Sequence, residues 1–145
     1  TGNDVSATSA GIALLGTTNV TLGTSTPTDR NVIGNIPGAD APGIQVAGSS
    51  NIDIVNAYIG MNEAGDAQPI NGFGIFLGDS QNVTIGSSDP AERVYVGNTG
   101  GGIGLLAFGG TPSQNITIQG NTFGLAPDGT TPAPLTGPSV TAVAG

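Results

Sequence analysis

Two arginines are the only basic residues in the chain, and they occupy matching places in the sequence. Arg30 follows Asp29, Arg93 follows Glu92, and the two arginines are 63 residues apart. A guanidinium group pairs well with carboxylates, so a surface arginine could neutralise a uronate substrate. It could equally hold a turn in place by bonding loop carbonyls or its neighbouring acid. We favour the turn role, because a catalytic residue has little reason to recur at equivalent places in a repeat.

Three acidic residues lie in loops that could face one another. Glycoside hydrolysis needs two carboxylates roughly 5–9.5 Å apart on either side of one bond. Glu63, Asp66 and Asp128 fall in loops that belong to the second and fourth sequence repeats, and two repeats of stacked parallel strands are about 9.6 Å apart. The glycines beside Asp66 and Asp128 are typical of turns. We therefore assign no catalytic residue to these loops.

The composition excludes several classes of function. Ten acidic residues against two basic ones give a net charge of −8, which argues against a nucleic-acid partner because phosphates need clustered Lys or Arg. Neither Cys nor His is present, so a thiolate or imidazole metal site is excluded, and no apolar run is long enough to insert into a membrane. Asp89 and Glu92 could bind Ca²⁺ weakly, but no known Ca²⁺ pattern occurs. We expect no cofactor.

A short motif built around asparagine occurs four times. Each asparagine is followed by two apolar residues separated by one polar residue, and the spacings are 32, 31 and 33 residues: Asn19, Asn51, Asn82 and Asn115. A period of this length is the signature of stacked units. The elements that must position the arginines and acids are therefore repeats, and one solenoid domain covers residues 1–145.

Each repeat is expected to be a coil of three short strands. The coils begin near Gly11, Gly43, Gly74 and Gly102, and Val140 begins a partial fifth. An excursion that contains a proline and ends in an arginine interrupts the first and third coils, whereas the second and fourth coils end in a long loop. The sequence thus predicts that the true unit is a pair of coils.

Stacking the coils places identical side chains above one another. Parallel pairing at about 4.8 Å per coil predicts five inward columns, with Gly at the corners: Ile12, Ile44, Ile75, Ile103; Leu14, Val46, Leu77, Leu105; Val20, Ile52, Val83, Ile116; Leu22, Ile54, Ile85, Ile118; and Ile33, Ile59, Val96, Phe123. Tyr58 and Tyr95 should meet on the outer side of the third wall.

The four asparagines are expected to form a buried ladder in which each amide donates to and accepts from its neighbours. Asn19, Asn82 and Asn115 also begin N-x-T sequons, so glycosylation is the alternative. Asn51 keeps the position although Asp53 breaks its sequon, which favours the ladder. The outward column of Thr21, Asp53, Thr84 and Thr117 leaves ice binding open, but paired threonine columns are absent.

These repeats resemble those of right-handed parallel β-helix proteins, especially the Gly/Asn-rich repeats of large bacterial secreted and surface proteins. The resemblance rests on the repeated G-I-x-L/V and N-V-T-I segments, on R-N-V-I-G-N at residues 30–35, and on Ile-Gly or Phe-Gly followed by an acidic turn. It implies an all-β, right-handed parallel β-helix of about four and a half coils. That fold hosts lyases, glycosidases, adhesins and fibres, so it does not fix a function.

We expect a structural module at the cell surface or in a secreted protein. No capping helix covers the ends of the repeat array, and open strands are adhesive. Copies are therefore expected to stack end to end through the strands that carry Ile12, Leu14, Val140 and Val143, or to form part of a longer surface protein. The alternative is a carbohydrate-active enzyme or sugar-binding adhesin, for which a polysaccharide would be the partner.

Overall fold

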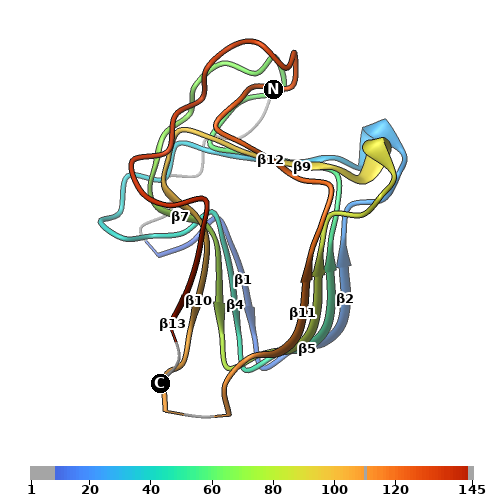
Figure 1. Ribbon diagram of the computed structural model, residues 1–145, viewed down its shortest axis with the longest axis vertical. Coiled ribbons are helices and arrows are strands. Elements are labelled where there is room, and N and C mark those ends of the chain that lie inside the picture. The colour runs from blue at the N-terminus through green and yellow to red at the C-terminus, as the bar shows by residue number, and fades with distance from the viewer. Residues whose placement is uncertain (1–8, 110, 144–145) are drawn as a thin grey trace.

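The computed structural model describes residues 9–109 and 111–143, and it is built almost entirely of short parallel strands. Three sheets form three sides of the molecule, and the strands of each sheet lie one behind another in Figure 1. The outer ends of the predicted domain, residues 1–8 and 144–145, lie outside the described residues. The arrangement is all-β and compatible with a parallel β-helix.

The three sheets are filled in strict rotation along the chain. The first sheet has the order β1 (Ile12–Leu15), β4 (Ile44–Ala47), β7 (Ile70–Gly78), β10 (Thr99–Leu106) and β13 (Val140–Val143). The second has the order β2 (Thr18–Leu22), β5 (Ser50–Ile54), β8 (Gln81–Ile85) and β11 (Gln114–Ile118). The third has the order β3 (Asn31–Ile33), β6 (Ala57–Ile59), β9 (Val94–Val96) and β12 (Thr122–Phe123). We call each successive set of three strands, one from each sheet, a rung.

The predicted inward columns are confirmed by the strand register. Ile12 pairs with Ile44, Ile44 with Ile75, and Ile75 with Ile103. The other four columns align in the same way. Together they form one apolar core, in which the members from the middle rungs are fully buried and most of those from the outer rungs are partly buried. Burying each aliphatic side chain contributes roughly 1.5–3 kcal/mol, so register errors are strongly disfavoured.

Two features of the strands differ from the sequence prediction. Strand β7 begins at Ile70 and β10 at Thr99, several residues before the glycines expected to open these coils, because Ile70 and Thr99 pair with each other across a bulge. The two excursions each contain a 3-10 helix, η1 (Pro27–Asp29) and η2 (Pro90–Glu92). In both helices a proline stands at the first turn, where its fixed φ and missing N–H cost nothing. These helices project together from one corner in Figure 1.

Candidate functional site

The four asparagines of the repeated motif are joined by side-chain hydrogen bonds. Nδ2 of Asn51 donates to Oδ1 of Asn19 at 3.0 Å, Asn82 donates to Asn51 at 3.0 Å, and Asn115 donates to Asn82 at 2.9 Å. All three bonds run in the same direction along the stack. The amide dipoles are therefore aligned, and the row is polar, with a donor facing one end of the molecule and an acceptor facing the other.

The expectation that this row is buried was wrong, because all four asparagines are exposed. Each has a positive φ, between 53° and 59°, and the strand register passes over it from the residue before to the residue after. A left-handed residue turns its side chain out of the pleat, and asparagine tolerates that conformation better than other residues with a Cβ. The repeated asparagine thus satisfies a backbone requirement as well as a side-chain one.

A second polar column, which the sequence analysis did not identify, lies two residues before the asparagines. The backbone N–H of Thr17 donates to Oγ of Ser49, that of Ser49 to Ser80, and that of Ser80 to Ser113, at 3.0–3.2 Å. Ser49 and Ser80 are buried, and each of these two hydroxyls in turn donates to a backbone carbonyl. The recurrence of Ser or Thr at this place in all four repeats is the signal that could have revealed it.

Arg30 contacts the next rung rather than its own turn. Its Nε donates to Oδ1 of Asn56 at 3.0 Å, and its guanidinium lies 4.2 Å from the ring centroid of Tyr58. Asn56 is 2% exposed, and its Nδ2 donates to the carbonyls of Thr24 and Thr26 at 2.9 Å. One buried amide therefore joins the excursion that contains η1 to the arginine that ends it.

Arg93 occupies the equivalent place but has different partners. Its Nε donates to the carbonyl of Gly120 at 2.9 Å, and its guanidinium lies 6.0 Å from the ring centroid of Tyr95, on its own rung. Asn121, one residue further along, accepts from the N–H of Val94 and donates to the carbonyl of Ile85. Both arginines thus bond the loop of the following rung.

Tyr58 and Tyr95 meet on the third sheet, as an edge-to-face pair with ring centroids 5.4 Å apart. Tyr58 is buried and packs with Met61 and Ala133 from the two long loops. Burial raises the pKa of the Tyr58 phenol, while the nearby positive charge of Arg30 acts in the opposite direction. The two tyrosines therefore pack beneath the long loops.

The acids of the long loops hold their own turns. Oδ2 of Asp66 accepts from Nδ2 of Asn62, whose Oδ1 accepts from the N–H of Asp66. Asp128 accepts from the hydroxyl and N–H of Thr131 and from the N–H of Thr130. These bonds, that from the Thr131 hydroxyl foremost, lower the pKa of Asp128 from 3.8 to about 2. Glu63 is exposed.

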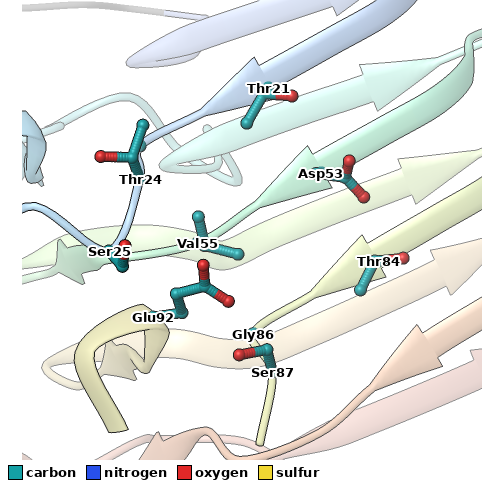
Figure 2. A pocket seen from close by; sticks show the side chains of 10 residues that line it. Thr21, Thr24, Ser25, Asp53, Val55, Thr84, Gly86, Ser87 and Glu92 are labelled. Atoms are coloured by element: carbon teal, nitrogen blue, oxygen red, sulfur yellow. The ribbon is translucent and has the colours of Figure 1, made fainter. Parts of the chain in front are cut away.

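A shallow groove crosses the second sheet between the two excursions. Its cavity volume is about 340 Å³, and Figure 2 shows the carboxylates of Asp53 and Glu92 among hydroxyl groups that line it. The hydroxyls come from both excursions and from the outward threonine column: Thr21, Thr24, Ser25, Thr84 and Ser87. The sequence analysis placed Asp53 on this outward column but did not bring Glu92 to it, because the fold of the excursion decides where Glu92 points.

The residues expected to mediate assembly lie on the outermost strands of the first sheet. Ile12 and Leu14 of β1 face the core, whereas Val140 and Val143 of β13 are 46% and 53% exposed. β1 pairs with β4, and β13 pairs with β10. Each of these strands therefore has one hydrogen-bonding edge without a partner strand among the described residues.

Searches with this sequence matched no protein-family model, no curated protein and no solved structure. Within residues 9–109 and 111–143, no helix is long and apolar enough to cross a membrane. The same residues contain no group of three or more acidic side chains arranged to hold a metal ion.

Proposed function

We propose that this protein is a structural module of the extracellular surface, a right-handed parallel β-helix of about four and a half coils whose edges accept further rungs. The additional rung comes either from a second copy stacked end to end, giving a filament, or from a longer surface protein. The observation that carries this proposal is the polarity of the asparagine row, because it makes the two ends of the stack complementary.

The complementarity can be followed atom by atom. At the β2 edge, Nδ2 of Asn19 has no acceptor among the described residues, and at the β11 edge Oδ1 of Asn115 has no donor there. In the same way Oγ1 of Thr17 can accept, and the N–H of Ser113 can donate, the bond that recurs between the inner rungs. Placing β2 of one copy on β11 of another would complete both columns without altering either.

Apolar burial supports the same contact. Val20 and Leu22 at one edge, and Ile116 and Ile118 at the other, are only partly buried, whereas their counterparts in the middle rungs are fully covered. A further rung would bury this remaining surface, which contributes roughly 25 cal/mol per Å². Open parallel edges are also the sites at which sheets extend between chains.

The first sheet sets a condition on stacking. It has five strands, whereas the second and third sheets have four, so β13 occupies the place that β1 of a second copy would take. Contact through all three sheets therefore requires β13 to move aside. A chain that ends at Ser139 should polymerise at lower concentration than the full chain.

Electron microscopy and light scattering across a concentration series test the self-stacking form of this proposal. We expect fibres one solenoid wide in the shortened chain and shorter ones in the full chain. Asn115→Gly should reduce their length, because it removes the terminal acceptor. Glycine keeps the positive φ of 54°, and inside the module only the bond to Asn82 is lost, so the fold should be preserved. Rods of constant length at every concentration, in both chains, would refute self-stacking.

A matched pair of variants tests the ladder inside the module. Asn82→Ala should destabilise the chain by about 1–3 kcal/mol, because two ladder bonds are lost and alanine is forced to a positive φ. Asn82→Gly removes the bonds but keeps the backbone conformation. The difference in stability between the alanine and glycine variants therefore gives the cost of backbone strain, and the remaining loss gives the contribution of the ladder bonds. Identical melting curves for Asn82→Ala and the unchanged chain would contradict a stabilising ladder.

The groove over the second sheet supports a second candidate, a carbohydrate-binding or carbohydrate-active protein. Carboxylates and hydroxyls from Asp53, Glu92 and the threonine column are acceptors and donors suited to sugar hydroxyls. Calorimetry with neutral and uronate oligosaccharides, with and without Ca²⁺, checks this candidate. Binding or cleavage that is lost in Asp53→Asn and retained in Asp128→Asn would rank it above the structural role.

A further inference from the structure

Three of the four ladder asparagines begin sequons that the sequence does not rank. Asn19, Asn82 and Asn115 are each followed by an apolar residue and a threonine, which is the pattern that accepts an N-linked glycan. All three are exposed, and each has a positive φ, at 59°, 53° and 54°. Exposure and backbone conformation therefore do not distinguish the three sites, and any selectivity must come from the hydrogen bonds of their side chains.

The atom that receives an N-linked glycan is Nδ2 of the asparagine, and the ladder engages it at two of the three sequons. Nδ2 of Asn82 donates to Oδ1 of Asn51 at 3.0 Å, and Nδ2 of Asn115 donates to Oδ1 of Asn82 at 2.9 Å. Asn19 takes part only through Oδ1, which accepts from Nδ2 of Asn51 at 3.0 Å. The ladder thus holds the Asn19 amide by its oxygen and leaves its nitrogen without an acceptor among the described residues.

Asn19 and Asn115 form a matched pair for comparison. Their strands, β2 and β11, are the outermost described strands of the second sheet, and each pairs on one side only (Figure 1). The sequon threonines, Thr21 and Thr117, are both exposed. The two sites therefore differ chiefly in the bonding of Nδ2. Asn82 is shielded further, because β8 is paired on both sides.

Glycan transfer uses Nδ2 as the nucleophile. The nitrogen attacks the anomeric carbon of a lipid diphosphate-linked oligosaccharide, the bond from that carbon to the diphosphate oxygen breaks, and the nitrogen loses one proton. Because resonance delocalises the lone pair of an amide nitrogen, the transferring enzyme must hold and twist the amide, and a nitrogen bonded to the next rung must first leave its acceptor. We propose that Asn19 is the N-glycosylation site of the folded chain and that the ladder protects the other two sequons.

The ladder and a glycan are therefore compatible at one end of the row. The extracellular location at which a glycan is added is part of the proposed function, whereas the choice among the three sequons rests on the ladder alone. A glycan on Asn19 would also cover the β2 edge, so fibres of the glycosylated chain should be shorter. Unchanged fibres would count against stacking through β2 and not against the glycosylation site.

Site-resolved mass spectrometry tests the selectivity on the folded full chain, supplied with a purified oligosaccharyltransferase and a lipid diphosphate-linked oligosaccharide. Peptides of residues 16–25, 79–88 and 112–121 give the reactivity of each sequon outside the fold. Relative to its own peptide, Asn19 should react on the order of tenfold faster than Asn82 or Asn115, because only the latter two must break a ladder bond.

Two glycine variants test the direction of the ladder. Asn82→Gly removes the acceptor of Asn115, so Asn115 should react about tenfold faster than in the unchanged chain. Asn51→Gly is the matched control, because it also removes two ladder bonds but leaves the bond from Asn115 to Asn82 in place. Both variants keep a backbone suited to glycine, at φ values of 53° and 56°. Circular dichroism checks that both remain folded, and Asn115 should stay protected in Asn51→Gly.

Each of three results would overturn this assignment. One is an equal relative reactivity of Asn19 and Asn115 in the folded chain. Another is a folded chain that carries no glycan on Asn19 although the three peptides react. The last is an equal gain at Asn115 in Asn82→Gly and Asn51→Gly, which would indicate general loosening of the stack rather than release of one nitrogen. None of these measurements depends on whether copies of the chain stack.

Discussion

The corners formed by Arg30 and Arg93 occupy equivalent places in the repeat, yet they are held together differently. Arg30 bonds the buried amide of Asn56 and stacks at 4.2 Å on Tyr58 of the following rung. Arg93 bonds a backbone carbonyl and lies 6.0 Å from Tyr95 of its own rung. The residue that faces Tyr95 from the next rung is Thr122, which offers no ring to a guanidinium. The position in the repeat therefore determines where the backbone of each arginine lies. The residues of the neighbouring rung determine which groups its side chain contacts.

The largest expected difference between equivalent sites concerns the glycines that end β6 and β12. Gly60 and Gly124 both have a φ near 80°, at 80° and 79°. A Cβ at Gly60 would overlap the carbonyl of Gly97, whereas one at Gly124 has its nearest neighbour 4.0 Å away. We expect Gly60→Ala to lower the free energy of unfolding by about 3–5 kcal/mol. Gly124→Ala should lower it by about 1–2 kcal/mol, from backbone strain alone. Urea denaturation measures both, and equal costs would contradict this account of the stack.

Asn56 offers the next largest effect, because it is buried and forms three hydrogen bonds. Asn56→Ala leaves two carbonyls and the Arg30 guanidinium without this partner, and we expect a loss of about 2–4 kcal/mol. Asn56→Gly copies the residue found at the equivalent position, Gly120, and keeps the positive φ of 48°. It should therefore lose less than the alanine variant. A glycine variant that is no more stable than the alanine variant would show that the backbone conformation is unimportant here.

The two arginines should respond unequally to truncation. Arg30→Ala should cost about 2 kcal/mol and Arg93→Ala about 1 kcal/mol, because only Arg30 combines a bond to a buried acceptor with a close aromatic contact. Arg30→Ala should also raise the pKa of Tyr58 further, since the guanidinium now opposes the effect of burial. Ultraviolet titration of the phenol follows this shift, and a lowered pKa in the variant would contradict the contact.

The raised pKa of Tyr58 has a consequence for stability at high pH. The phenol ionises more readily in the unfolded chain, whose pKa is near 10.0. The stabilisation is therefore complete below that pH and is lost as the pH rises through the higher value of the folded state. The slope of stability against pH in this range should disappear in Tyr58→Phe.

The smallest effect is expected in the long loops, where the second and fourth rungs use different acceptor groups to hold the turn. In the fourth rung the acceptor is the Asp128 carboxylate, with its pKa lowered from 3.8 to about 2, whereas in the second rung an amide oxygen of Asn62 accepts the backbone N–H of Asp66. The contribution of Asp128 is present above pH 3.8 and is lost as the pH falls towards 2. The amide resonances of Thr130 and Thr131 should therefore move over this range, and Asp128→Asn should abolish the movement.

The periodic part of this structure could be predicted because the signal is repeated. The members of an inward column occur at the same position in every repeat. One such column, in which each member directly follows the repeated asparagine, is Val20, Ile52, Val83 and Ile116, and parallel stacking aligns these residues. The 3-10 helices and the early starts of β7 and β10 were missed, because they depend on contacts that occur only once or twice along the chain.

The sequence alone determined which residues share a column. The apolar residues recur at the same positions in each repeat, so only one register between neighbouring strands covers all of them. The tertiary structure decided the rest. It turned the asparagine row outward, because a positive φ at each asparagine rotates the amide out of the sheet. It also gave Arg30 and Arg93 different partners, placed Glu92 and Asp53 along the same groove, and brought the rings of three phenylalanines, Phe73, Phe76 and Phe108, into contact. Each of these outcomes depends on what the adjacent rung presents across about 4.8 Å, and no single repeat contains that information.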